Sequence, residues 1–404
     1  MKRRGYIFEQ IIDMDNLRLA FYKAQQGKSA KKDVLQFCEN LDSNLLAIRN
    51  GLLNENYRFG SYHYFMIYDP KCRVICAASF EERVIHHAIM NICSTHFENY
   101  QIPYSYACRK NKGTFAAIEK AAYYQKKYAW YLKLDVRKYF DSIDHEILFD
   151  KLKLMYKDKR LLDMFWQIID SYHAQDGKGL PIGNLTSQYF ANHYLSFADK
   201  QATEQLRIPA YVRYMDDMLL WSDDKTELME KGILFERFIA QNLQLSLKPF
   251  IINKTEHGLP ALGFLLYPNQ IRLNRRSKKR FVTKLTGYTN LLNTDSISEK
   301  QFAQCTLSLY GFISHANSKG FATQILQEIG LNTKGSNRVN RGGRWNNDAQ
   351  NVRVPNRNNN TPDNRNSNIG FRLASITKQQ QIDFEQVSIS FPEKGKNNFS
   401  LSGE

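Results

Sequence analysis

The sequence predicts an α+β fold, in which helices cover small sheets. Up to about residue 330, apolar residues recur at helical spacing in several segments, and short β-prone runs alternate with those segments. Two stretches, 211–222 and 262–273, are each divided by turn residues in the manner of a hairpin. The 404 residues allow two or three domains with a sizeable core.

Charge and composition narrow the class of protein. Lys and Arg number 56 against 40 Asp and Glu, which gives a formal charge of +16, and aromatic residues make up 13%. Cations together with aromatic rings suit a protein that follows phosphates and stacks on bases. Ribosomal and membrane-surface proteins share a basic balance, so charge alone does not decide. The 43% hydrophobic content excludes wholesale disorder.

Cysteine usage and the N-terminus point to a cytoplasmic protein. The six cysteines form no CxxC pair, and no second half at ligand spacing follows Cys72 and Cys76, so we expect free thiols in a reducing compartment. Met1–Arg4 is basic, but no apolar signal-peptide core follows it. No apolar run approaches the ~18 residues of a membrane span.

The elements expected along the chain follow from periodicity and turn residues. Helices are predicted over 10–25, 33–52, 81–99, 114–128, 147–156 and 226–242. A short buried strand is predicted over 130–136. The first hairpin turns at 215–217 and the second breaks at Pro268–Asn269. The stretch 298–329 is expected to be mainly helical, with an interruption around Gly311.

Three carboxylates stand at the ends of the predicted strands. Asp135 ends the strand over 130–136, and Asp216 and Asp217 lie at the tip of the first hairpin. A buried carboxylate is costly unless it is paired or binds a metal. An Asp-Asp pair in an ordinary β-turn is the alternative, but these acids have apolar flanks. Hard oxygen ligands suit Mg²⁺, and two such ions can support an in-line phosphoryl transfer.

At these residues the chain resembles a reverse transcriptase. Tyr214–Asp217 (YMDD) is similar to the hallmark motif of that family, and 134–145 is similar to its first palm motif. The resemblance implies a right-hand polymerase fold with fingers, palm and helical thumb. It also implies that Asp135, Asp216 and Asp217 are catalytic ligands of two Mg²⁺ ions, for which Mn²⁺ can substitute. Template RNA, primer or cDNA, and dNTPs would be the partners.

Phe140 falls where the family has its steric gate, whose bulky ring excludes a ribose 2′-OH. The alternative is a core aromatic residue. The acids beside it, Asp141 and Asp144, are expected to serve the turn and the cap of the following helix.

Between the two acid sites, the segment 179–192 is predicted to be a Gly/Pro loop that feeds a helix with a polar N-terminus. Its position matches the palm motif that packs on the templating base and the incoming nucleotide. Ile182, Gly183 and Gln188 depart from the usual pattern and resemble the enzymes of diversity-generating retroelements. In that family this loop is implicated in low-fidelity copying opposite template adenines. A small basic accessory protein is a partner that this resemblance implies.

Further segments resemble other parts of the polymerase. Lys248 is expected to bind the nucleotide and to assist pyrophosphate departure, although a surface lysine is an equal alternative. Residues 262–264 (Leu262, Gly263 and Phe264) resemble the primer grip. Fingers-like segments contain the triphosphate-binding candidates Arg73, Arg109 and Lys71. A basic patch, expected to track nucleic acid in the thumb, consists of Arg275, Arg276, Lys278, Lys279 and Arg280.

The Asn/Arg-rich segment over 331–375 is similar to the C-terminal end of retroelement variable proteins. Those proteins have a C-type-lectin-like fold related to formylglycine-generating enzymes. Asn codons are adenine-rich, which suggests a reading frame that runs into the template repeat. The alternative is an Asn-rich linker that binds RNA through its arginines.

The domain boundaries expected from these motifs are an N-terminal helical extension over 1–50, fingers over 51–130, palm over 131–270, thumb over 271–330, the Asn/Arg-rich segment over 331–375 and a tail over 376–404. The predicted function is RNA-directed DNA polymerase of a diversity-generating retroelement. A reverse transcriptase of a group II intron, a retron or an abortive-infection system is the nearer alternative. A non-catalytic RNA-binding protein on a degenerate palm, which would be free to lose the acids, and a lectin-like binding protein are the others.

Overall fold

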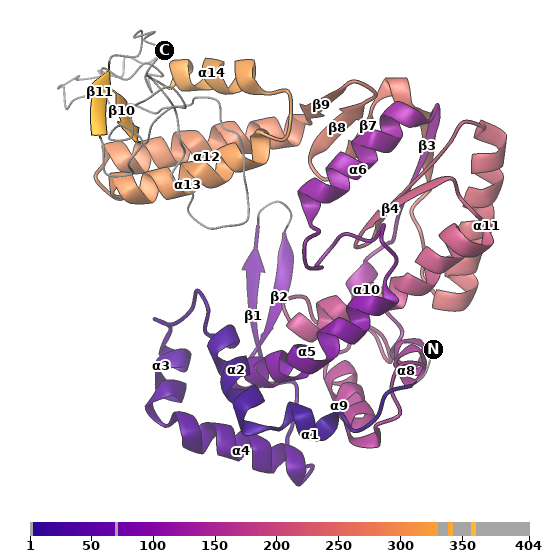
Figure 1. Ribbon diagram of the computed structural model, residues 1–404, viewed down its shortest axis with the longest axis vertical. Helices are drawn as coiled ribbons and strands as arrows, with labels where there is room; N and C mark the ends of the chain where they lie inside the picture. Colours follow the sequence, from indigo (N-terminus) through magenta and orange to yellow (C-terminus); the bar gives the residue numbers. More distant parts are fainter. Residues whose placement is uncertain (1–2, 69–71, 330–337, 342–356, 361–404) are drawn as a thin grey trace, which may run out of the picture. The chain divides into compact units, whose positions relative to one another are not determined.

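The computed structural model describes residues 3–68, 72–329, 338–341 and 357–360 (Figure 1). The chain divides into two compact units, Met1–Ile271 and Arg272–Glu404. Both are rich in helices, and the sheets are small and antiparallel, which confirms the mixed α+β class. In the part of the chain that the structure describes, no helix is both long and apolar enough to cross a membrane.

The first unit is built around a four-stranded antiparallel sheet with the order β4-β5-β3-β6. Its strands are β3 (Trp130–Asp135), β4 (Ala210–Tyr214), β5 (Asp217–Ser222) and β6 (Ile251–Lys254). The predicted strand over 130–136 and the predicted first hairpin are therefore present. Asp217, however, opens β5 instead of belonging to the turn.

Helices α6 (Thr114–Lys127) and α11 (Lys225–Leu243) cover opposite faces of this sheet (Figure 1). On one face, the indole of Trp221 donates to Gln125 of α6 over 2.9 Å. On the other, the Tyr211 ring packs edge-on against Phe235 of α11. A Cβ at Gly232 would lie 2.5 Å from the Leu132 side chain. The small residue therefore allows α11 to approach the sheet closely.

The N-terminal helices are shorter than the sequence predicted. They are α1 (Phe8–Ile11), α2 (Met14–Ala24), α3 (Lys32–Glu39) and α4 (Leu41–Leu53). The predicted helix over 10–25 breaks because Asp13 caps α2 by accepting the backbone N–H groups of Asp15 and Asn16. The predicted helix over 33–52 breaks at Asn40, which lies between α3 and α4.

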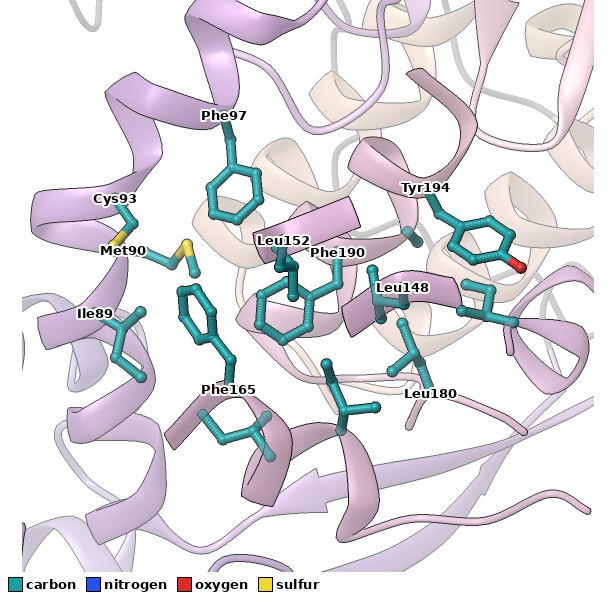
Figure 2. Packing of buried hydrophobic residues seen from close by; sticks show 14 of the residues in the cluster. Ile89, Met90, Cys93, Phe97, Leu148, Leu152, Phe165, Leu180, Phe190 and Tyr194 are labelled. Carbon is teal, nitrogen blue, oxygen red and sulfur yellow. The ribbon is translucent and has the colours of Figure 1, made fainter. Parts of the chain in front are cut away.

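A second part of the core lies among α5 (Phe80–Tyr100), α8 (His145–Lys153), α9 (Lys159–Asp170) and α10 (Leu185–Lys200). Figure 2 shows Phe97, Phe165 and Phe190 meeting there from three of these helices. The rings of Phe165 and Phe190 are 5.2 Å apart in a T-shaped contact. The sequence predicted α5 closely, whereas α9 was not predicted. The short α7 (Tyr139–Ser142), the π-helix Gln201–Gln205 and the 3₁₀ turn Thr255–His257 complete the helices of this unit.

A two-stranded hairpin, β1 (Tyr62–Ile67) and β2 (Arg73–Ala78), lies in the region expected to form fingers. Its outer side chains are apolar and exposed, with Tyr64, Phe65 and Met66 each more than two-fifths exposed. The sequence did not predict these strands. The hairpin matters for the site because β2 contacts the Gly/Pro loop, as described below.

The second predicted hairpin is a three-stranded sheet of β7 (Leu259–Ala261), β8 (Phe264–Tyr267) and β9 (Gln270–Leu273). Leu262 and Gly263 form the turn between β7 and β8, both at positive φ, so Leu262 does not begin a strand as predicted. Pro268–Asn269 separates β8 from β9 as predicted.

The second unit contains α12 (Arg275–Asn293), α13 (Glu299–Ile313) and α14 (Lys319–Glu328), together with the strand pair β10 (Arg338–Arg341) and β11 (Arg357–Asn360). The Phe281 ring of α12 meets Tyr310 of α13 and Phe321 of α14. The sequence predicted an interruption of this helical stretch around Gly311. Gly311 instead lies inside α13, and the interruption falls at 314–318.

Candidate active site

The sheet register brings Asp135 and Asp217 directly opposite each other. Asp135 is the last residue of β3 and pairs with Asp217, the first residue of β5. Directly paired side chains point to the same face of a sheet, with Cβ atoms about 5 Å apart. Asp216 directly precedes Asp217, in the two-residue turn between β4 and β5. Two segments separated by some eighty residues in the sequence thus present their acids at one edge of the sheet.

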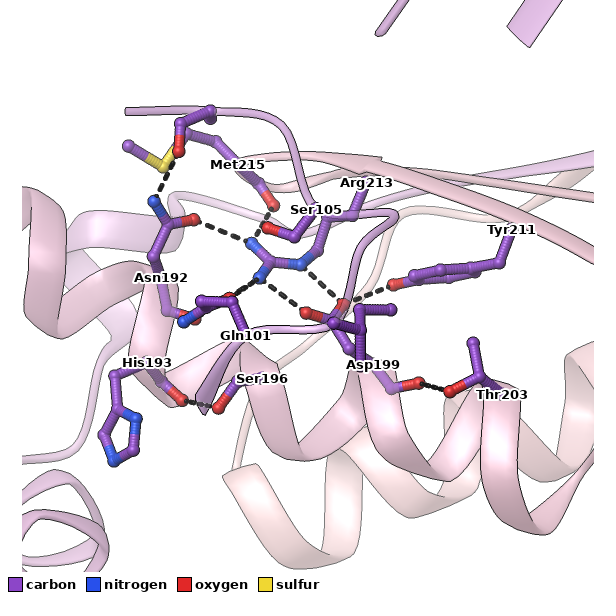
Figure 3. Close-up of polar contacts among 12 residues, drawn as sticks. Gln101, Ser105, Asn192, His193, Ser196, Asp199, Thr203, Tyr211, Arg213 and Met215 are labelled. Atoms are coloured by element: carbon purple, nitrogen blue, oxygen red, sulfur yellow. Dashed lines mark hydrogen bonds and ion pairs between the residues drawn. The ribbon is translucent and has the colours of Figure 1, made fainter. Parts of the chain in front are cut away.

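The turn that carries Asp216 is held from inside the protein. Met215 has a φ of 52°, which is unfavourable for a residue with a side chain. Figure 3 shows Arg213 beneath this turn, where its guanidinium donates to the Met215 carbonyl over 3.1 Å. The same guanidinium forms a fully buried ion pair with Asp199 of α10, at 2.6 and 2.7 Å. The contact fixes the strained turn against α10.

The network around Arg213 extends to further polar groups. Asn192 of α10 accepts from Arg213 over 3.0 Å, and the Tyr211 hydroxyl donates to Asp199 over 2.8 Å. The sequence analysis missed Asn192 and Asp199 as part of the site. A usable signal was present, since an arginine inside the apolar β4 requires a buried carboxylate partner.

Burial and the neighbouring carboxylates both act on the pKa of Asp216. Burial raises the pKa of Asp216 above its ordinary value, and the charges of Asp217 and Asp135 raise it further. Arg73 of β2 is near enough to act in the opposite direction on that pKa. The sequence-predicted residues Asp135, Asp216, Asp217 and Arg73 therefore share one electrostatic environment.

Two lysines contact the acids. Lys248 Nζ lies 2.7 Å from Asp135 Oδ1, and Lys133 Nζ lies 3.2 Å from Asp217 Oδ1. Asp217 Oδ1 is buried, and within the described residues it accepts no well-aligned hydrogen bond. The three acids do not place their oxygens within 4.8 Å of one another as a closed ligand group. Each lysine thus supplies a positive charge to one of these carboxylates.

The donor set fits a hard divalent cation. Carboxylates with a poorly satisfied buried oxygen and mutual repulsion lose free energy unless a positive charge joins them. Asp135, Asp216 and Asp217 would hold such an ion, and Lys248 and Lys133 would release their carboxylates when it binds.

The Gly/Pro loop is attached to the β1–β2 hairpin. The Ile182 carbonyl accepts from the Cys76 backbone over 2.8 Å, and Asn184 Oδ1 accepts from the Ala78 backbone over 3.0 Å. Gly183 has a φ of 127°, and a Cβ there would lie 2.8 Å from the Ile75 side chain. Only glycine combines this backbone with so close a neighbour. The loop thus links the hairpin to α10.

The same loop also contacts the segment after Asp135. The Leu180 backbone donates to the Phe140 carbonyl over 2.8 Å. The Phe140 ring is half-buried and packs against the core. Gln188 is half-buried in α10. Asp144 caps α8 by accepting from the Ile147 backbone, as predicted for that acid.

Arg109 has a different environment from the one that triphosphate binding requires. Its guanidinium binds both oxygens of Glu98, and it also donates to the carbonyls of Ile102 and Ser105. Only 7% of the side chain is exposed. These contacts favour a structural role in the loop after α5. Lys71 lies outside the described residues.

The other predicted residues lie on separate elements. Leu262 and Gly263 form the β7–β8 turn, and Phe264 is fully buried in β8. The basic patch occupies the first turns of α12 in the second unit, where Arg275, Arg276, Lys278, Lys279 and Arg280 are all exposed. The N-terminal end of a helix is positive, so five cations there favour binding of an anion such as phosphate.

Two protein-family models match the chain. Residues 68–265 match the reverse transcriptase (RNA-dependent DNA polymerase) model, and residues 295–376 match the sulfatase-modifying factor enzyme 1-like domain. The second match begins between α12 and α13 and continues into the Asn/Arg-rich segment. Of that segment, only β10 and β11 belong to the described residues.

Curated relatives are similar at low identity. The putative COX1/OXI3 intron 1 protein of Saccharomyces cerevisiae is 24% identical over 48% of this chain and 25% of its own length. The group II intron-encoded protein LtrA of Lactococcus lactis is 23% identical over 32% of this chain and 23% of its own. Protein YkfC of Escherichia coli is 21% identical over 40% of this chain and 47% of its own. The chain thus spans about a quarter to half of these relatives.

Proposed function

Because residues 68–265 form a reverse transcriptase (RNA-dependent DNA polymerase) domain, we propose that the chain copies a template RNA into error-prone cDNA. This domain is related at low identity to group II intron-encoded proteins. The element would be a bacterial or phage diversity-generating retroelement. The observation that carries the catalytic part is the register that sets Asp135 against Asp217, with Asp216 in the adjoining turn.

In this proposal Asp135, Asp216 and Asp217 hold two Mg²⁺ ions, which polarise the attacking and leaving oxygens when bound. Arg73 binds the triphosphate of the incoming dNTP by charge-assisted hydrogen bonds. Lys248 leaves Asp135 and donates a proton to the departing pyrophosphate. The Phe140 ring excludes a ribose 2′-OH, while Arg213 and Asp199 keep the Asp216 turn in place.

The remaining elements take their roles from the same proposal. Residues 51–130 serve as fingers, 131–270 as palm and 271–330 as thumb, after a helical extension over 1–50. The exposed basic residues at the start of α12 track the phosphates of the template and primer. The turn at Leu262 and Gly263, with Phe264 behind it, holds the primer end. A small basic accessory protein of the retroelement would be a further partner of the chain.

Two observations support the retroelement subtype. Ile182 and Gln188 stand where the Gly/Pro loop departs from the common reverse transcriptase pattern, and an apolar Ile182 offers no hydrogen bond to restrain a nucleotide. The match of residues 295–376 to a sulfatase-modifying factor domain agrees with the relation expected for a variable-protein sequence. The segment over 331–375 would then be translated template repeat, followed by a tail over 376–404.

A second candidate function rests on the curated relatives, two of which are named as intron proteins. In that case the chain would copy an intron, retron or defence-system RNA with ordinary fidelity. The acid site and its chemistry would be the same. The two candidates differ only in template and in accuracy opposite adenine.

Primer extension on an adenine-containing RNA template tests the catalytic assignment. Sequencing of the resulting cDNA tests the retroelement subtype. We expect the wild-type protein to extend the primer with errors concentrated opposite adenine, and Asp216→Ala to extend nothing. Extension by Asp216→Ala would overturn the catalytic assignment. Accurate copying opposite adenine would overturn the retroelement subtype and leave the polymerase in place.

A further inference from the structure

A cluster of two histidines and one aspartate lies next to the loop that carries Ile182. It consists of His145, the first residue of α8, Asp170, the last residue of α9, and His173 just after α9. His145 Nδ1 lies 3.9 Å from Asp170 Oδ1, and His173 Nε2 lies 3.4 Å from the same oxygen. One ligand atom from each residue falls within 4.8 Å of the others. Among the described residues, no other group of three such side chains meets that condition.

The buried member of the cluster has a nitrogen without a partner. His145 is 1% exposed, and its Nδ1 forms no hydrogen bond within the described part of the chain. Its other nitrogen, Nε2, lies 2.8 Å from the Gly179 carbonyl, which accepts only if Nε2 carries the proton. That tautomer leaves the Nδ1 lone pair free and directed into the cluster. Leaving such an atom buried without a hydrogen-bond partner costs free energy.

We propose that His145 Nδ1, Asp170 and His173 bind a divalent transition-metal ion, with Zn²⁺ as the preferred ion and water as the fourth ligand. Two imidazole nitrogens and a carboxylate oxygen are a donor set that suits Zn²⁺. Ligand atoms about 2.1 Å from a tetrahedral ion lie roughly 3.4 Å apart, so His173 and Asp170 are already at that spacing. His145 needs to approach Asp170 by only a fraction of an ångström.

The hydrogen bonding of His145 is typical of a histidine that binds a metal. Metal-binding histidines commonly donate their second N–H to a backbone carbonyl, as His145 does to Gly179. Asp170 and His173 are each at least two-fifths exposed, so an ion can enter from solvent.

The site would fasten the Gly/Pro loop to two helices. The Gly179 backbone N–H donates to the Ile143 carbonyl over 2.8 Å, and the following residue, Leu180, donates to Phe140. A metal bound to His145 would therefore restrict the motion of the loop residues 179–182 relative to α8, α9 and Phe140. This consequence for nucleotide selection rests on the proposed function, whereas metal binding itself does not.

Zn²⁺ titration of the full chain in competition with a chromophoric chelator tests the site. Excess Mg²⁺ is included so that the carboxylates of Asp135, Asp216 and Asp217 are occupied. The variants are Asp170→Asn combined with His173→Gln, and the matched control His257→Gln, which removes an exposed histidine elsewhere. We expect wild type and control to bind one tight Zn²⁺ more than the double variant, which keeps only one of the three ligands. Loss of an outer-shell partner alone costs about 10–100-fold in metal affinity, so the double variant should lose at least that much.

Thermal unfolding gives an independent measurement, because an ion that binds only the folded state raises the melting temperature. Zn²⁺ should raise it for wild type and His257→Gln but not for the double variant. If the double variant does not fold as judged by circular dichroism, Asp170→Asn alone takes its place. Equal Zn²⁺ stoichiometry and affinity in all the chains would overturn the proposal. Polymerase activity enters neither measurement, so failure of the proposed function would be seen separately.

Discussion

Arg213 Nη1 donates to the Met215 carbonyl over 3.1 Å, and this contact joins a buried ion pair to the turn that carries Asp216. The Asp199 partner of Arg213 belongs to α10, which begins directly after the Gly/Pro loop. The acid turn and that loop are therefore held by the same helix. A change in α10 would alter both the acids and the Ile182 loop.

Arg213→Met should destabilise the protein strongly, because it leaves the Asp199 carboxylate buried without its partner. Breaking a buried pair in this way costs about 3–5 kcal/mol. Urea unfolding followed by circular dichroism measures it. The control is Lys153→Met, which breaks the exposed pair with Asp150 and should cost at most about 1 kcal/mol. Similar losses for both variants would contradict the role given to the Arg213 network.

Asp216→Asn should abolish primer extension while leaving the protein folded and slightly more stable without divalent ions. Its carboxylate is half-buried and repelled by Asp217 and Asp135, so an uncharged isostere removes an unfavourable interaction. Thermal melting in EDTA and primer extension in Mg²⁺ measure the two effects. Asp141→Asn, a nearby acid expected to serve only the local turn, should retain activity. If Asp216→Asn melts well below wild type, the carboxylate is a structural group instead.

Gly183→Ala should destabilise the protein more than Gly113→Ala does. Both glycines have a φ near 110–130°, where a side chain costs on the order of 1 kcal/mol. A Cβ at Gly183 would also meet Ile75 at 2.8 Å, whereas nothing lies within 4 Å at Gly113. The crowding adds about 1–3 kcal/mol. Equal unfolding free energies for the two variants would mean that the loop can move away from β2 without cost.

The buried pair Glu82–His86 should make stability depend on pH. Burial raises the pKa of Glu82 from 4.5 to about 7 and lowers that of His86 to about 3. A raised carboxyl pKa contributes stability that is complete below about 4.5 and is lost as pH rises through about 7. A depressed histidine pKa acts in the opposite sense, with stability present above about 6.5 and lost as pH falls toward 3.

The Glu82 contribution can be isolated with Glu82→Gln, which mimics the neutral acid. Relative to wild type, this variant should gain stability steadily as pH rises from about 4.5 to 7. Its Oε1 can still accept from the Gly60 and Ser61 backbones, as Glu82 Oε2 does. Denaturant unfolding at several pH values provides the comparison. A constant difference over that range would show that Glu82 is ionised in the folded protein at all of these pH values.

Much of the candidate site could be predicted from local signals. The apolar run before Asp135 and the YMDD hairpin predicted β3, β4 and β5, because strand alternation and turn residues act within a few positions. Asp144 was correctly expected to cap a helix for the same reason. The helix breaks at Asp13 and Asn40 were missed. The apolar periodicity continues across both residues, and a single Asp or Asn does not by itself show that a helix ends there.

The long-range contacts were decided by the tertiary structure. The sequence by itself determined which residues are acids at strand ends and many of the helical and β-prone segments, although it missed α9, β1 and β2. Only the folded chain set Asp135 against Asp217, placed Arg213 on Asp199, engaged Arg109 with Glu98 and gathered His145, Asp170 and His173. The physical reason is that sheet register and helix packing minimise exposed apolar surface and buried unpaired charge over the whole unit, and no local pattern records that balance.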